Sequence, residues 1–131
     1  MKLGQAFLVR EHLEEVLGAL GSRITQEKAL ALPTDQTFSE YVSALEQLKD
    51  VEFAITYTEN VSYVGGVPLS FFISRRDAQQ RMLDLLKRVD IITYKDKIID
   101  LLNAIKADDE VLHVSSWSLD LQMPKLEASE T

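Results

Sequence analysis

Apolar side chains recur every three or four residues along most of the chain, and this spacing constrains the fold more than any other feature of the sequence. Residues three and four positions apart lie on one face of an α-helix. The first such stripe contains Leu3, Ala6, Phe7, Leu13, Val16, Leu17, Leu20 and Ile24. It predicts one long amphipathic helix from Leu3 to about Ala31. Several helices of this kind predict a mainly α fold of antiparallel amphipathic helices, a helical bundle or a coiled-coil-like arrangement.

Three further helices are predicted downstream of Pro33, which ends the first one. Their expected ranges are about Phe38 to Thr58, Pro68 or Leu69 to Arg88, and about Tyr94 to Lys106. Thr37 and Glu40 have the spacing of a capping box, in which two side chains bond to free backbone N–H groups at a helix start. We therefore expect the second helix to begin beside Thr37.

Two segments depart from the helical spacing. Gly65-Gly66 lies between short β-branched and aromatic runs, so residues 61–67 are expected to form either a short β-hairpin or an irregular loop. Apolar and polar residues alternate from Trp117 to Met123, which predicts a C-terminal extended strand. Its partner would be the 61–67 segment or a sheet edge in another subunit. We expect residues 1–123 to form a single helical domain and residues 124–131 a flexible tail.

Composition excludes several classes of function. The chain has 131 residues, 46% of them hydrophobic, which is enough for one globular domain. A net charge of −7 argues against nucleic-acid binding, because phosphate contacts require a basic face. The absence of cysteine excludes disulfides, thiolate catalysis and cysteine-based zinc sites. Neither a secretion signal nor an 18-residue apolar stretch is evident, so we expect a cytoplasmic protein that does not span a membrane.

No local motif marks an active site. The two histidines are far apart in the sequence, and His12 with Glu15 is better explained as a solvated surface pair than as part of a metal site. His113 has no paired acid. The sequence contains no nucleophile elbow, phosphate-binding loop or dinucleotide fingerprint. We therefore predict no catalytic residues, no metal site and no cofactor.

Four residues are candidates for ligand or partner binding. Arg75, Arg76 and Asp77 interrupt a strongly apolar helix start. They would either form an ion-pair network that fixes the register of the helices, which is the favoured interpretation, or contact an anion or a partner protein. Trp117 would either anchor the C-terminal segment on the helices or dock on a partner protomer.

Several short pieces of the sequence occur together in one order. The chain opens with MKLGQAFLVREHL and continues with Arg23-Ile24; TEN follows at 58–60, then Leu69 with Arg75-Arg76-Asp77, and WSLDL at 117–121. These pieces resemble the M-K-L-x-x-A-x-x-x-R-x-x-L start, the T-N, the L-x-x-x-x-x-R-R-D and the closing W-x-x-D-L of septicolysin-like bacterial proteins of unknown function. The resemblance implies a largely helical, coiled-coil-like fold without an assigned activity.

Three functions are compatible with these features. The favoured one is a self-associating interaction or scaffold module without catalytic activity, because wide apolar stripes in a small chain need more cover than the chain supplies. We expect a homo-oligomer, with a protein partner as a further prospect. One alternative is a ligand-binding or enzymatic domain with a pocket between helices. The other is a membrane-active, haemolysin-like protein, which the family resemblance implies and the apolar PLSFFI segment would allow.

Overall fold

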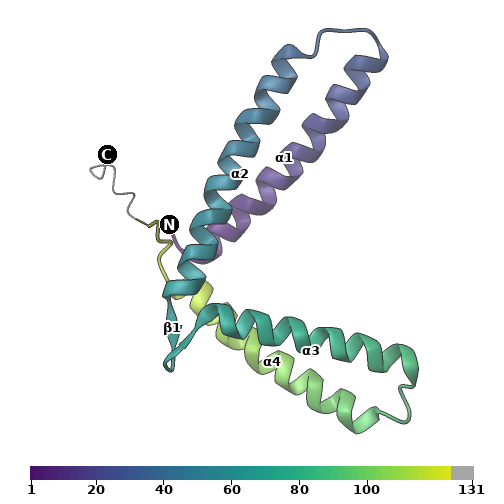
Figure 1. Cartoon of the computed structure of the whole chain (residues 1–131), viewed down its shortest axis with the longest axis vertical. Helices are drawn as coiled ribbons and strands as arrows, with labels where there is room; N and C mark the ends of the chain where they lie inside the picture. Colours follow the sequence, from purple (N-terminus) through teal and green to yellow (C-terminus); the bar gives the residue numbers. More distant parts are fainter. Residues whose placement is uncertain (125–131) are drawn as a thin grey trace, which may run out of the picture.

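Two helical hairpins diverge from a common junction like the arms of a V (Figure 1). The structure is a computed structural model that describes residues 1–124. Its elements are α1 (Leu3–Ala29), α2 (Asp35–Val61), β1 (Tyr63–Val64), β2 (Val67–Pro68), α3 (Leu69–Val89) and α4 (Lys95–Ser118). We call α1 with α2 the first arm, α3 with α4 the second arm, and their junction the vertex. The prediction of a mainly α fold is confirmed.

Each arm is held together by one stripe of inward-facing side chains. On α2 the covered positions follow alternate steps of four and three residues: Thr37, Tyr41, Ala44, Leu48, Val51, Ile55 and Thr58. On α4 the same steps give Ile98, Leu101, Ile105, Asp108, Leu112 and Ser115. This spacing keeps one face of a helix against one neighbouring helix. Each arm therefore buries a narrow seam, and the second arm has its own small core of Leu83, Ile98, Leu101 and Ile105.

The turn between α1 and α2 differs from the prediction at one helix end. Ala31 adopts a left-handed φ of 56°, and the Leu32 N–H donates to the carbonyl of Glu27 over 2.8 Å, which is the geometry of a Schellman cap. Helix α2 then begins at Asp35 with Thr34 as its N-cap. The predicted capping box at Thr37 is wrong, because Thr37 is buried inside the helix and its hydroxyl donates to Glu27.

Helix α4 is much longer than the predicted helix that ended near Lys106. It continues to Ser118, although Asp108, Ser115 and Ser116 interrupt its apolar stripe with buried polar groups. Trp117 and Ser118 therefore lie in a helix and not in the predicted strand. From Leu119 the backbone is extended, and Asp120 forms an isolated antiparallel bridge with Lys2. In the described residues the partner of this segment is thus the start of the chain, not residues 61–67.

The β-hairpin predicted near residues 61–67 is confirmed. Tyr63 pairs with Pro68 and Val64 with Val67. Both residues of the two-residue turn, Gly65 and Gly66, have positive φ angles, of 59° and 80°. Glycine adopts this conformation without strain, and such turns match the twist of the paired strands.

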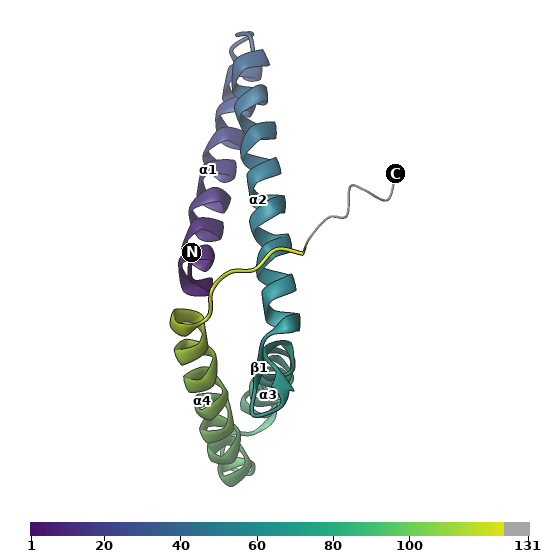
Figure 2. The same ribbon diagram turned by 90° about the vertical axis from the view of Figure 1, so that its left-hand side faces the viewer.

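The vertex is closed by the segment that follows α4. This segment crosses from the end of α4 to α2 (Figure 2). The Leu3 N–H donates to the Leu119 carbonyl over 2.9 Å, and the Leu121 N–H donates to the Met1 carbonyl over 2.8 Å. The Gln122 N–H donates to the hydroxyl of the buried Thr58, also over 2.8 Å. Beneath these bonds lies the larger core, Leu3, Ala6, Ile55 and Leu69, with Leu112, Leu119 and Leu121 packed against it.

Of the described helices, none has a run of residues long and apolar enough to cross a bilayer. The predicted flexible tail, 124–131, lies outside the described residues except for Pro124.

Gly4 lets the end of α4 approach the start of α1. A Cβ atom at this position would lie 3.0 Å from both the Ser116 carbonyl oxygen and the Trp117 ring. We expect Gly4→Ala to lower the free energy of unfolding by about 1–3 kcal/mol, since an overpacked contact forces neighbours to shift. Urea denaturation followed by circular dichroism measures this change.

Gly18→Ala is the matched control, because no atom lies within 4 Å of a Cβ at Gly18. It should raise the free energy of unfolding by about 0.5–1 kcal/mol through helix propensity alone. Equal changes in the free energy of unfolding for the two substitutions would show that the close packing at Gly4 does not require glycine.

Candidate functional site

A pocket of about 350 Å³ lies at the vertex, and α1, α2, α3 and α4 all contribute to its walls. We call it the vertex pocket. Its lining residues are Leu3, Phe7, Arg10, Glu59, Leu69, Ile73, Arg76, Asp109 and Leu112. Five of the nine are apolar, and the other four are charged. A concave apolar surface with a few convergent polar groups is the usual form of a small-molecule site.

Two of the four charged residues of the pocket are positive and two are negative, and Arg76 has closer carboxylate partners than Arg10 has. Arg76 donates from Nε to Asp109 across the α3–α4 interface, and its Nη1 lies 3.6 Å from Asp77. The guanidinium carbon of Arg10 lies 5.2 Å from the centre of the Phe7 ring, within the range of a cation–π contact. Within residues 1–124, Arg10 forms no ion pair with a carboxylate at 4 Å or less.

Glu59 has the most distinctive environment of these groups. It is half-buried, and burial raises the pKa of its carboxyl group, while the positive charge of Arg10 lowers it by a smaller amount. Removal from water disfavours the charged form of a carboxyl group. A perturbed acid in a pocket is a recognised sign of a functional position.

Arg75 has a structural partner outside the pocket. Its Nε donates to Asp108 Oδ2 over 3.0 Å and its Nη2 to Asp108 Oδ1 over 2.5 Å, a two-point pair across α3 and α4. These bonds raise the pKa of the Arg75 guanidinium. Arg75 also lies 5.4 Å from the Phe71 ring centre and 5.3 Å from that of Phe72. Arg75 and Arg76 thus take part in the interhelical ion-pair network that the sequence favoured.

The other predicted positions lie apart from the pocket lining. Asp77 is exposed on α3, and Trp117 is half-exposed on the last turn of α4 with its ring against Gly4. Partner binding by Trp117 stays a prediction. His12 and Glu15 are both exposed on α1, and the described residues contain no group of three or more side chains arranged to hold a metal ion.

Sequence reasoning found Arg76 but missed Arg10, Glu59 and Asp109. These residues lie on three different helices and share no local motif. The single available signal was a charged residue beside an apolar stripe, and that pattern is shared by many solvated helix positions. Their convergence depends on the angle between the arms, which the sequence pattern does not specify.

Comparisons of the chain with protein-family models, curated proteins and solved structures gave no match. The resemblance to septicolysin-like proteins therefore stays a prediction.

The two aspartates that bind the arginines form a matched pair for mutagenesis. The side chain of Asp108 is 3% exposed and that of Asp109 is 47% exposed. We expect Asp108→Asn to lower the free energy of unfolding by about 2 kcal/mol, since it weakens two charge-assisted bonds at a buried position. Asp109→Asn should cost less than about 1 kcal/mol, as for other exposed pairs. Similar losses in urea denaturation would contradict this distinction.

The raised pKa of Glu59 predicts a pH-dependent stability difference. A carboxyl group whose pKa is higher in the folded state binds its proton more tightly there, so folding becomes less favourable as pH rises from the unfolded-state pKa through the folded-state pKa. Around this carboxyl group lie the charges of Arg10 on α1, Arg76 on α3 and Asp109 on α4. We expect Glu59→Gln to be more stable than the wild type at neutral pH, with the difference disappearing in acid.

Thermal melts across a pH series measure this difference. Glu52→Gln, at an exposed position on α2, is the control and should show no such trend. A Glu59→Gln variant that is less stable than the wild type at neutral pH would show that the charge stabilises the fold.

Proposed function

We propose that this protein is a self-associating helical scaffold module in which the side formed by α2 and α3 packs against the same side of a second copy. The observation that carries the proposal is a second apolar stripe on each of these helices, separate from the seam inside each arm. Helices α2 and α3 lie on one side of the molecule, and α1 and α4 lie on the other (Figure 2).

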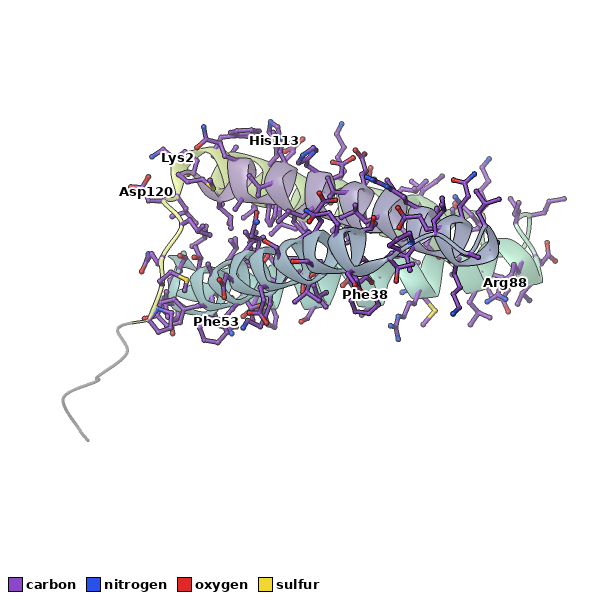
Figure 3. All side chains as sticks on the ribbon, turned by 90° about the horizontal axis from the view of Figure 1, so that it is seen from above. Lys2, Phe38, Phe53, Arg88, His113 and Asp120 are labelled. Carbon is purple, nitrogen blue, oxygen red and sulfur yellow. The ribbon has the colours of Figure 1, made fainter. Side chains whose placement is uncertain are left out.

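The stripe on α2 leaves large side chains in contact with solvent. Phe38, Val42, Leu45 and Phe53 keep between 46% and 54% of their surface exposed. Phe38 and Phe53 both lie on the side of α2 that is away from α1 (Figure 3). Between Leu45 and Phe53 the surface of α2 contains a hollow of about 530 Å³. Such a hollow can receive a side chain from another helix.

The stripe on α3 has the same character. Phe71, Met82, Leu85 and Val89 are between 45% and 60% exposed. Met82, Leu85 and Val89 follow steps of three and four residues, so they form one continuous face. Leu83 and Leu86, which pack in the core of the second arm, lie on a different face. The exposed stripe is therefore left over after α3 has packed on α4.

The exposed area is consistent with an interface of ordinary size. The chain exposes 9248 Å², whereas a compact monomer of 14.8 kDa exposes about 7,000 Å². Residues 125–131, outside the described range, can account for at most about 1,100 Å² of this difference. The remaining excess is more than about 1,000 Å², and a stable interface covers about 800 Å² on each partner.

A second copy is the occupant that fits both stripes at once. In a two-fold symmetric dimer the same surface serves both subunits, so an apolar side meets an apolar side of equal length. Helices α2 and α3 would then each have neighbours on two faces, while α1 and α4 would lie on the outside of the dimer.

Substitutions on the α2–α3 side test this proposal. Light scattering after size exclusion should give about twice 14.8 kDa for the wild type at high micromolar concentration. Val42→Asp and Leu85→Asp should each weaken dimerisation by about tenfold or more, because they place a charge in an apolar interface. Both positions are exposed in the monomer, so circular dichroism should show unchanged helix content.

Val114→Asp is the matched control on the opposite side. Val114 is 65% exposed and lies one turn from Trp117 on α4. This variant should keep the mass of the wild type. A monomeric wild type would overturn the proposal, and so would dissociation by Val114→Asp with no effect of Val42→Asp or Leu85→Asp.

A further inference from the structure

The vertex pocket has the shape and the charges of a ligand site that self-association does not require. We infer that it binds a small zwitterion with a carboxylate, a neighbouring ammonium group and an apolar body, which is the chemistry of a free apolar amino acid. Three features of the pocket support this inference: its apolar wall, the charges of Arg10 and Glu59, which form no ion pair at 4 Å or less within residues 1–124, and its electrical balance.

The apolar part of the ligand would lie against the apolar wall of the pocket. Phe7 from α1, Ile73 from α3 and Leu112 from α4 all line the pocket. An apolar group that leaves water for such a wall gains about 25 cal/mol for each Å² that it buries. The volume of about 350 Å³ admits a single small molecule and excludes a folded segment of another protein.

Arg10 is the group that would receive the carboxylate. Its guanidinium lies against the Phe7 ring, and no carboxylate in residues 1–124 is within ion-pair distance of it. The aromatic contact holds the side chain in place without using its N–H donors. A guanidinium presents parallel donors that match the two oxygens of a carboxylate.

Glu59 is the group that would receive the ammonium. It has lost part of its hydration, the charge of Arg10 compensates for a smaller part of this loss, and no side chain in residues 1–124 donates a hydrogen bond to it. A half-buried carboxyl group of this kind is unfavourable for folding unless it is paired. An ammonium group from a ligand would supply both the missing charge and the missing donors, with Asp109 in the same pocket as a second acceptor.

The balance of charge distinguishes a zwitterion from a simple anion or cation. Arg10 and Arg76 contribute two positive charges to the pocket, and Glu59 and Asp109 contribute two negative charges. A ligand with one net charge would meet repulsion as well as attraction. A neutral ligand with separated charges can face both pairs favourably, as electrostatic complementarity requires.

Isothermal titration of the full-length protein with L-leucine and L-phenylalanine tests the inference. Concentrations up to about 10 mM cover even a weak, millimolar Kd. We expect saturable binding that Arg10→Gln and Glu59→Gln each weaken by about tenfold or more, the usual loss for a bond to a charged group. Arg81→Gln, at an exposed position on α3 outside the pocket, should bind as the wild type does.

Two ligand analogues test the chemistry separately. N-acetyl-L-leucine lacks the ammonium group and L-leucinamide lacks the carboxylate, so both should bind at least about tenfold more weakly than leucine. The inference is overturned if neither amino acid binds, if the analogues bind as tightly as leucine, or if Arg10→Gln binds normally. Thermal melts of each variant establish that a loss of binding is not a loss of folding.

Discussion

The relative position of the two arms depends on the backbone hydrogen bonds that join residues 119–122 to the start of α1 and to Thr58. Thr58 is fully buried, and its hydroxyl both donates to the Ala54 carbonyl and accepts from the Gln122 N–H. A buried hydroxyl without partners would cost about 1–3 kcal/mol. This one side chain therefore ties α2 to the segment that follows α4. Together with the core of Leu3, Ala6, Ile55 and Leu69 beneath it, this tie holds the two arms together at the vertex, where the pocket lies.

The periodicity of apolar residues was sufficient to predict the helices, because each arm buries a seam with regular steps of three and four residues. It failed where polar groups occupy the seam. Asp108 interrupts the stripe of α4, but Arg75 neutralises it across the interface, so the helix continues to Ser118. Thr37 has the local spacing of a cap, yet it packs against α1 through Glu27. In both cases a contact with a neighbouring helix determined the structure, and the local sequence pattern alone did not predict it.

The candidate site was largely beyond prediction for a related reason. Arg10, Glu59 and Arg76 come from separate helices, and nothing in the sequence around each one distinguishes it from a solvated residue. Glu59 in particular is kept at a position where burial disfavours its charge. Residues that oppose stability in this way are common at functional positions, where the requirements of binding and of folding differ. The apolar stripes on α2 and α3 are a similar case, since their exposed hydrophobic side chains contribute little to the stability of the single chain.

The closure of the vertex also has a kinetic consequence. Contacts within each arm join residues that are close in sequence, whereas the vertex joins Lys2 to Ser118 and Asp120, at the two ends of the described chain. Local helical hairpins form quickly, and contacts between distant residues form late because a long loop must close first. Each arm can therefore assemble while the angle between the arms is still unset. The vertex pocket would be completed in the last step of folding, after the rest of the molecule is in place.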